Sequence, residues 1–210
     1  MAMPKAAPQS ETAGGKLARD VAAYIRARKA LIRVESKESG RVERSLLDAA
    51  TIANSRILAW DIVRGAVELD GSPAYLNQVL IDPKQTKAPP QILGFIDRER
   101  LRLVDAHKAL VESVKDGADP KPLDGFERIV WVLRDFDPYY KGDPTIRRHL
   151  KNLAEDLAKT PREGASCIIL LTTSPDVPAD LADSLVSVKW TFPDRAELAA
   201  ILDDAINGLP

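Results

Sequence analysis

Apolar residues recur along the chain with two spacings, one typical of helices and one typical of buried strands. Some segments carry an apolar residue every third or fourth position, which predicts amphipathic helices at residues 16–29, 40–55, 97–115 and 144–159. Short apolar runs lie between these segments and predict strands at residues 30–35, 57–63, 128–136, 166–172 and 185–192. Because strands alternate with helices, we expect an α/β fold in which a parallel sheet lies between two helical layers.

Three further stretches complete the predicted organisation. Glycines and prolines interrupt every periodic run in residues 64–95, which predicts a long irregular excursion. Residues 1–15 mix Pro, Ala, Ser and Gly without periodicity, as in a flexible tail, so the folded domain is expected to occupy residues 16–210. A last helix is predicted from Asp194 onward.

Composition and charge exclude several classes of protein. Apolar residues make up 45% of the 210 residues, which is enough for a hydrophobic core. Thirty basic and 31 acidic residues leave a net charge of -1, so no overall field attracts nucleic acid or an anionic membrane. The apolar runs are too short to span a bilayer, and the start of the chain lacks an apolar signal core. We therefore expect a soluble, cytoplasmic protein.

Several conspicuous side chains are assigned to packing rather than to a site. The large aromatic side chains of the strands and the single cysteine are expected in the core: Trp60, Trp131, Trp190 and Cys167. Tyr139 and Tyr140 follow a strand and are expected to be half-exposed. His107 and His149 lie on separate predicted helices without a partner at metal-ligand spacing, so they do not predict a metal site.

The connection between the first predicted strand and the next helix is where a phosphate-binding loop would lie. Such a loop is rich in glycine and presents backbone N–H groups and a lysine to the phosphates. Residues 35–47 read ESKESGRVERSLL and contain no GxxxxGK(S/T) motif. Lys37 and Arg41 are the candidate phosphate contacts, but the three glutamates of this segment would repel a phosphate. The junction is therefore interpreted as an ordinary turn from strand to helix.

Polar residues end the third and fourth predicted strands. Asp135 lies where an ATP-hydrolysing α/β domain holds Mg²⁺, and Phe136 takes the place of the glutamate that would activate water. Asp137 is displaced by one residue, which re-aims its side chain. Thr172 and Thr173 end the fourth strand, where a polar sensor of the γ-phosphate would lie. If nucleotide binds, Asp135 is the candidate metal ligand and the two threonines are candidate nucleotide contacts.

Taken together, these segments resemble the AAA+ ATPase superfamily. More narrowly, the chain resembles the degenerate N-terminal domain of the two-domain AAA+ proteins first noted as hypothetical chloroplast reading frames. The matching segments are IRAR at residues 25–28, RDFDP at 134–138, PTIRRHLKNLAEDLAKT at 144–160, CIILLTTSPDVPADL at 167–181 and FPD at 192–194. The resemblance covers about residues 17–208, with a poorly matched middle third. It implies a three-layer α/β/α fold of the P-loop type, with five parallel strands in the order 5-1-4-3-2.

The chain departs from an active AAA+ module at four places. It has no Walker A lysine and no catalytic glutamate, and Asp183 and Ser184 stand where an arginine finger is expected. It ends after one predicted helix beyond the FPD segment, so no helical lid domain is expected. Because four catalytic parts are missing together, the resemblance implies a domain that does not hydrolyse ATP on its own. No cofactor is then expected.

Three functions follow from these observations. The first is a non-catalytic AAA+-like module for assembly or regulation, which forms a ring with copies of itself or with an active ATPase domain, or binds another protein. The second is an ATP- and Mg-binding protein with unorthodox contacts, in which Lys37 or Arg41 binds phosphate and Asp135 binds Mg²⁺. The third is a nucleic-acid-binding accessory domain that uses Arg26, Arg28, Lys29, Arg147 and Arg148.

Overall fold

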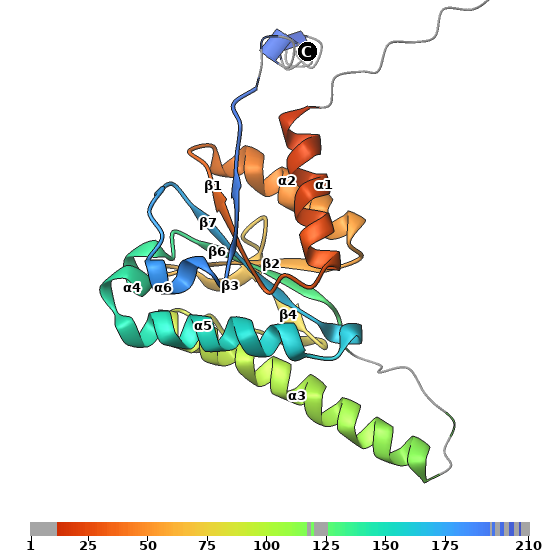
Figure 1. Cartoon of the computed structure of the whole chain (residues 1–210). Helices are drawn as coiled ribbons and strands as arrows, with labels where there is room; N and C mark the ends of the chain where they lie inside the picture. Colours follow the sequence, from red (N-terminus) through yellow and green to blue (C-terminus); the bar gives the residue numbers. More distant parts are fainter. Residues whose placement is uncertain are drawn as a thin grey trace, which may run out of the picture.

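A six-stranded sheet lies at the centre of the part of the chain that the structure describes (Figure 1). The structure is a computed structural model and describes residues 12–116, 119, 126–193, 195, 198, 199, 202, 203 and 206. The sheet has the order β3-β2-β6-β7-β1-β8. Its parallel strands are β1 (Leu31–Glu35), β2 (Arg56–Asp61), β6 (Ile129–Arg134), β7 (Cys167–Thr172) and β8 (Val186–Lys189). These five are the predicted strands, and each predicted pair of neighbours is present, but the predicted count of five is wrong.

The sixth strand comes from the segment expected to be irregular. β3 (Gly65–Glu68) follows β2 after a tight turn and pairs antiparallel with it at the edge of the sheet. A separate hairpin of β4 (Tyr75–Leu76) and β5 (Val79–Leu80) and the 3₁₀ turn η1 (Pro83–Gln85) come next. The expected irregular excursion at residues 64–95 is therefore wrong. Its strands are two to four residues long, too short for an alternating pattern to stand out between glycines and prolines.

Helices cover both faces of the sheet, which gives the expected three-layer arrangement (Figure 1). α1 (Ala13–Arg26) and α2 (Ser39–Ile52) pack on one face, and α3 (Pro89–Lys115) and α5 (Pro144–Lys159) pack on the other. Short elements at the connections are α4 (Asp137–Gly142), α6 (Ala179–Ala182) and the 3₁₀ turn η2 (Arg162–Gly164). The sheet is thus buried between two helical layers, as expected for parallel strands.

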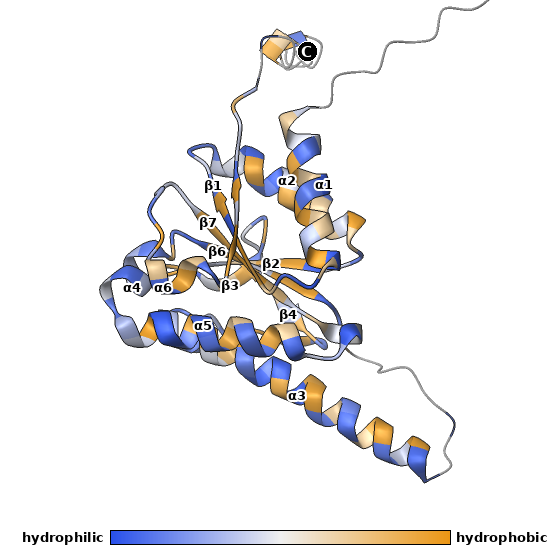
Figure 2. Cartoon of the chain, in the orientation of Figure 1, coloured by the Kyte–Doolittle hydropathy of each residue, from blue (hydrophilic) through white to orange (hydrophobic). Residues whose placement is uncertain are grey.

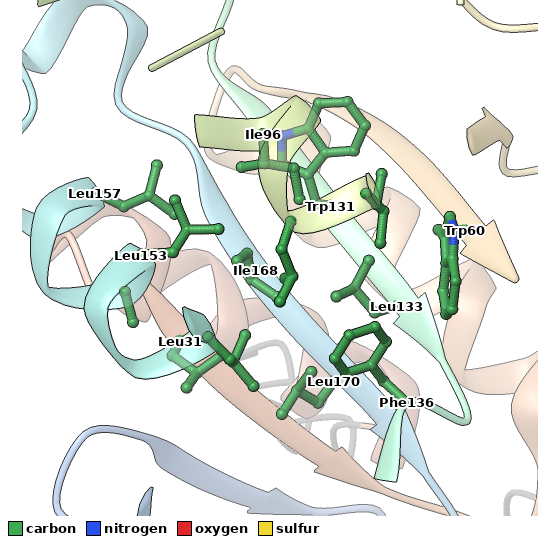
Figure 3. Close-up of a cluster of buried hydrophobic side chains, with 14 of the residues drawn as sticks. Leu31, Trp60, Ile96, Trp131, Leu133, Phe136, Leu153, Leu157, Ile168 and Leu170 are labelled. Carbon is green, nitrogen blue, oxygen red and sulfur yellow. The ribbon is translucent and has the colours of Figure 1, made fainter. Parts of the chain in front are cut away.

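β6 shows why its sequence is apolar at almost every position. Side chains alternate between the two faces of a strand, so Trp131 and Leu133 belong to the core under α3 and α5 (Figure 3). Val130 and Val132 belong to the core under α1 and α2. A central strand with helices on both faces has no solvent-facing side, so both sets of positions must be apolar.

α3 begins earlier than predicted, at Pro89 rather than at residue 97. Pro89 and Pro90 were read as helix breakers, yet they occupy the first helical positions, where the missing N–H and the fixed φ of proline fit. Gln91 accepts a hydrogen bond from the Ala88 N–H (3.0 Å) and so helps to cap this end. Of the described helices, including this long one, none has the length and apolar content needed to cross a membrane.

The amino-terminal end of the predicted domain differs from expectation. α1 begins at Ala13, and Thr12 caps it by accepting a hydrogen bond from the Gly15 N–H (3.0 Å), so the end of the expected tail is helical. Residues 1–11 lie outside the described residues. Asp194, the expected start of the last helix, also lies outside them. After it, Leu198 and Leu202 are helical and exposed.

The core assignments are confirmed for the three tryptophans and for Cys167, each of which is less than 9% exposed. Tyr139 is partly buried. The expectation for Tyr140 is wrong, because this side chain is completely buried. Its hydroxyl donates a hydrogen bond to the buried Asp137 carboxylate, which removes the cost of placing a phenol in the interior. Burial and this hydrogen bond raise the pKa of Tyr140 far above its ordinary value.

Substitution of Gly65 tests the turn that starts β3, and Gly40 in α2 serves as a control. Gly65 has a φ of +73°, and a Cβ there would lie 2.7 Å from Thr86 Oγ1 and 2.9 Å from Pro83 O. We expect Gly65→Ala to lower the free energy of unfolding by about 2 kcal/mol, through backbone strain and this clash. In contrast, Gly40 lies in the first turn of α2 with nothing within 4 Å of the added Cβ. Gly40→Ala should raise stability by about 0.5 kcal/mol, as measured by urea unfolding. If Gly65→Ala and Gly40→Ala changed the free energy of unfolding equally, the assigned turn would be contradicted.

Candidate functional site

The carboxyl ends of β1, β6 and β7 meet the start of α2 at one pocket, the position where parallel α/β sheets bind ligands. The pocket has a volume of about 390 Å³. It is lined by Ser36, Ser39, Gly40, Glu43, Arg64, Leu69, Arg134, Asp135, Leu171, Thr172 and Thr173. Of the predicted site residues, Asp135, Thr172 and Thr173 therefore come together here, whereas Lys37 and Arg41 do not line the pocket.

The connection between β1 and α2 is a short turn. β1 ends at Glu35 and α2 begins at Ser39, which leaves three residues between them. Ser36 Oγ accepts a hydrogen bond from the Glu38 N–H (2.9 Å), which closes the turn on itself. Lys37 is exposed at the tip. This geometry agrees with an ordinary turn from strand to helix and differs from a phosphate-cradling loop.

An ion pair between Arg134 and Glu43 lies across the pocket. Arg134 Nε and Nη2 donate to the two carboxylate oxygens of Glu43, at 2.6 and 3.0 Å, which is the bidentate geometry of strong pairs. The two side chains are 15% and 17% exposed, so solvent screens the pair little. Arg134 Nη2 also donates to the Leu69 carbonyl (3.0 Å), which connects β6 to the segment after β3. The first two turns of α2 are thus attached to the end of β6 through side chains.

Asp61 and Arg64 extend this pair toward the turn between β2 and β3. Asp61 Oδ2 lies 3.8 Å from Arg134 Nη1 and accepts a hydrogen bond from Arg64 Nε (2.7 Å). Burial alone would raise the pKa of Asp61, but the pKa of this carboxyl group lies below its ordinary value. Backbone N–H groups of Arg64 and Val63 and the Arg64 side chain hold the charged form. The pocket wall therefore carries paired opposite charges, although Arg134 Nη1 is buried without a hydrogen-bond partner.

The glutamates of the junction do not act as free negative charges. Glu35 lies 3.6 Å from Arg33, and Glu38 lies 3.3 Å from Arg41. Trp190 Nε1 also donates to Glu38 (2.7 Å), and the Arg41 guanidinium lies 5.5 Å from the centre of the Trp190 ring. Arg41 is therefore held against β8 and its extension, away from the pocket. The expected repulsion of phosphate is weakened by this pairing, but so is the expected attraction by Arg41.

Asp135 occupies the predicted position with an unusual backbone. Its φ of +49° lies in the left-handed region, and its N–H donates to the Leu171 carbonyl (3.0 Å), so the chain turns sharply where β6 ends. The Asp135 side chain is exposed at the pocket, whereas Phe136 turns inward against Trp60, with ring centroids 5.2 Å apart. Asp137 is buried and accepts from Tyr140, so its carboxylate is not directed at the pocket.

The two threonines have different environments. Thr172 is buried, and its Oγ1 accepts a hydrogen bond from the Ser174 N–H (3.0 Å). Thr173 is exposed beside it. Among the residues that the structure describes, no group of three or more His, Cys, Asp or Glu side chains could hold a metal ion. A Mg²⁺ ion in this pocket would therefore have to take most of its ligands from nucleotide and water, and Asp135 could supply one protein ligand.

A buried polar network supports the floor beside this pocket. Arg33 is 3% exposed in the middle of β1 and donates to the Ser174 carbonyl. Lys141 Nζ donates to Ser174 Oγ (2.6 Å), so α4 is attached to the same loop after β7. Together with the bond from Tyr140 to Asp137, these contacts fix the segments that follow β6 and β7. Sequence reasoning missed this network, although an arginine inside the strand LIRVE was a visible signal.

The basic residues considered for nucleic acid include two arginines that are held at opposite ends of α5. Arg28 donates to the carbonyls of Ala158 and Thr160, at the carboxyl-terminal end of α5. Arg147 donates to Asp180 (2.9 Å) and to the Tyr140 carbonyl, at the opposite end of α5. With a rise of about 1.5 Å per residue, the two ends of this helix are about 20 Å apart. The two groups of basic residues therefore lie at opposite ends of α5.

Known proteins place the chain within a family. Residues 17–190 match the family model described as SpoVK-like AAA ATPase, N-terminal domain. A curated relative from Guillardia theta, the uncharacterized AAA domain-containing protein ycf46, is 23% identical over 181 residues. This match covers 86% of the chain and 28% of the relative, so the chain spans less than a third of that relative's length.

Two solved structures match the chain with TM-scores below 0.5, and no structural argument is drawn from them. The HORMA:CdnC:Trip13 complex of E. coli MS115-1 gives a TM-score of 0.48 at 7% identity, over 94% of this chain and 65% of that one. Drosophila ORC bound to DNA gives 0.37 at 10% identity, over 88% and 98%. The family model, in contrast, matches most of the chain. The predicted AAA+ relationship is thus confirmed, and the chain belongs to the SpoVK-like AAA ATPase N-terminal domain family.

Proposed function

We propose that this chain is a non-catalytic AAA+-like module of the cytoplasm. It serves assembly or regulation, in a ring with copies of itself or with an active ATPase domain. The observation that carries this proposal is the pair of Arg134 and Glu43 at the carboxyl ends of the strands. There, the carboxylate of Glu43 occupies two of the three guanidinium nitrogens of Arg134, which leaves only Nη1 without a hydrogen-bond partner for a phosphate.

The chemistry of phosphate binding supports the proposal. A phosphate is bound by backbone N–H groups of a glycine-rich loop and by a lysine that reaches its oxygens. Here the loop is reduced to three residues, and Lys37 is exposed outside the pocket. A phosphate that entered the pocket would meet the Glu43 carboxylate and would compete with it for Arg134. Both effects disfavour nucleotide binding.

A partner domain is favoured by the extent of the match with the relative. The chain corresponds to 28% of a longer AAA domain-containing protein, and the family model describes an N-terminal domain. An N-terminal module without its own phosphate loop is suited to position a neighbouring ATPase domain rather than to power it. This supports an active AAA+ domain as the partner, alongside copies of the same chain.

Titration with Mg-ATP tests the nucleotide part of the proposal. We expect no saturable heat when millimolar Mg-ATP is added to the 210-residue chain in a calorimeter, and no phosphate release above the buffer rate. Glu43→Gln serves as a comparison, because it removes the competing charge while keeping the size of the side chain. Saturable binding to the wild-type chain that is lost in Lys37→Ala or Asp135→Ala would overturn the proposal.

That opposite result would favour a second candidate function, ATP and Mg²⁺ binding through unorthodox contacts. One observation supports this candidate: Asp135, Thr172 and Thr173 line the same pocket as Gly40. Gly40 lies in the first turn of α2 with open space above it, so a ligand could approach the helix backbone closely. Under this alternative, Asp135 would hold Mg²⁺ and the threonines would contact the nucleotide.

A further inference from the structure

The two edges of the central sheet differ in how their backbone groups are satisfied. At the β3 edge, the Ala66 N–H donates to Thr86 Oγ1 (3.0 Å), and the Glu68 N–H donates to the Ser72 carbonyl (2.9 Å). The segment that follows β3 thus covers this edge. At the other edge, β8 pairs with β1 on one side, and none of the described segments pairs with its other side. Figure 1 shows β8, in blue, as the last strand beyond β1. We call its unpaired side the β8 outer edge.

Backbone geometry identifies the groups that lie on the β8 outer edge. The Trp190 N–H donates to the Glu35 carbonyl (3.0 Å) and therefore faces β1. Successive residues of a strand direct their backbone groups to opposite sides. The N–H and C=O groups of Ser187 and Lys189 therefore point outward, and Thr191 continues the alternation just beyond the strand. A row of such groups is a template for pairing with another extended chain.

The side chains of β8 leave one of its faces partly uncovered. Val188 and Trp190 contact the core under α1 and α2, and Val186 lies on the same face by alternation. Both valines nevertheless remain partly exposed, whereas Ser187 and Lys189 are exposed on the opposite face. In Figure 2, β7 is largely in the apolar colour, and the strand that leads toward the C-terminus changes between apolar and polar colours. A further strand beside β8 would cover the remaining surface of the valines.

A groove follows the β8 outer edge. It has a volume of about 250 Å³ and lies between α1 and β8. α1 contributes Leu17 and Tyr24 to its wall, and β8 with its continuation contributes residues 187–191. A groove between a helix and an edge strand suits an extended peptide, because main-chain hydrogen bonds hold the peptide and alternate side chains enter the groove. A helical partner has already used its backbone groups internally, so only an extended segment satisfies this edge.

We propose that the β8 outer edge binds an extended segment of a partner chain as an added strand. The side chains of this segment that enter the groove, beside Val188 and Trp190, should be apolar. Of the charged residues that line the groove, two are lysines, Lys16 and Lys189, and one is Asp20. The residue opposite Lys189 should therefore be acidic, since opposite charges at facing positions stabilise paired strands. This inference names the kind of partner segment for the assembly role and rests on the proposed function.

A short peptide tests the added strand on the intact chain. The sequence Ac-Thr-Val-Glu-Val-Thr-NH₂ reads the same in both directions, so it fits a parallel or an antiparallel arrangement. Its glutamate lies opposite Lys189, and its threonines lie opposite Ser187 and Thr191. We expect saturable binding in a calorimeter, and amide hydrogen exchange slowed by about tenfold at Ser187 and Lys189 at saturating peptide. The Trp190 amide should change little, because it already donates to β1. No saturable binding at millimolar peptide would overturn the proposal.

Methylation of the peptide backbone separates strand pairing from adhesion through side chains. An N-methyl group removes the donor of one peptide bond and blocks pairing on that side. In an antiparallel arrangement the glutamate N–H faces β8, and in a parallel one the two valine N–H groups face it. One of the two methylated peptides should therefore lose binding, and the other should keep it. Loss in both peptides, or in neither, would overturn the proposal.

Reversal of one charge tests the register. Lys189→Glu should weaken binding of the glutamate peptide by about fivefold and strengthen binding of Ac-Thr-Val-Lys-Val-Thr-NH₂ by a similar factor. This rescue would also show that the variant is folded. Lys108→Glu is the matched control, because it makes the same charge change at a side chain of α3 that is 68% exposed. A preference that stays unchanged in Lys189→Glu, or that changes equally in the control, would contradict the assigned register.

The outcome is independent of the Mg-ATP titration. ATP binding would overturn the proposed function and leave peptide binding in place. A chain that binds neither ATP nor the peptide would overturn the added strand alone.

Discussion

Replacing Glu43 by alanine should lower the free energy of unfolding by about 3 kcal/mol. Glu43 and Arg134 are both more than four-fifths buried and form a bidentate pair. The substitution leaves the Arg134 guanidinium in a poorly hydrated place, where the more distant Asp61 at 3.8 Å compensates it incompletely. Urea unfolding followed by tryptophan fluorescence measures the loss.

A second ion pair of the chain is the matched control. Glu68 contacts Arg56, but both side chains are 29% exposed and Arg56 has Glu127 as another partner. Water and the second carboxylate compensate Arg56, so Glu68→Ala should cost about 1 kcal/mol or less. If Glu43→Ala lowers the free energy of unfolding no more than Glu68→Ala does, the pair of Glu43 and Arg134 is not shielded from solvent as described. The double variant Glu43→Leu, Arg134→Met should regain most of the lost stability, because it removes both charges together.

The largest loss of stability is expected at Trp60. Its side chain is completely buried, and its ring lies 5.2 Å from that of Phe136 and 6.1 Å from that of Tyr139. Its indole N–H donates to the Thr86 carbonyl. Trp60→Ala should therefore cost about 4 kcal/mol, because it leaves a cavity and an unpaired carbonyl in the core.

Trp60→Ala should also weaken the near-UV circular dichroism of the remaining aromatic side chains, since they lose their fixed neighbour. Tyr75→Ala is the control, because it truncates an aromatic side chain that is 47% exposed. We expect a change of about 0.5 kcal/mol for Tyr75→Ala. Comparable losses for the two variants would contradict the assigned core.

The layers of this fold could be predicted because they depend on local periodicity. β6 and β7 are apolar at nearly every position, and α5 carries a regular apolar stripe that begins after Pro144 and ends before Thr160. Such patterns are set by burial on two faces or on one. β3 could not be predicted in the same way, because a four-residue strand depends on its pairing with β2 rather than on its own sequence.

The candidate site was predictable only in its strand-end residues. Asp135, Thr172 and Thr173 follow apolar runs, and the ends of parallel strands meet at one edge of a sheet. The pairing of Arg134 with Glu43 joins positions 91 residues apart, and nothing in either segment marks it. The position of Arg41 against Trp190 depends in the same way on β8 lying beside β1. Contacts between positions so far apart in the sequence cannot be predicted from local patterns and require the folded structure.

The short connection between β1 and α2 also limits which substitutions could create a phosphate loop. A GxxxxGK(S/T) loop needs more residues between strand and helix than the three that are present here. Point substitutions can change those residues but cannot lengthen the path. A phosphate loop at this position would require an insertion together with the loss of Glu43, whose removal is expected to weaken the fold. A phosphate loop at this junction would therefore need two separate changes, an insertion and the removal of Glu43.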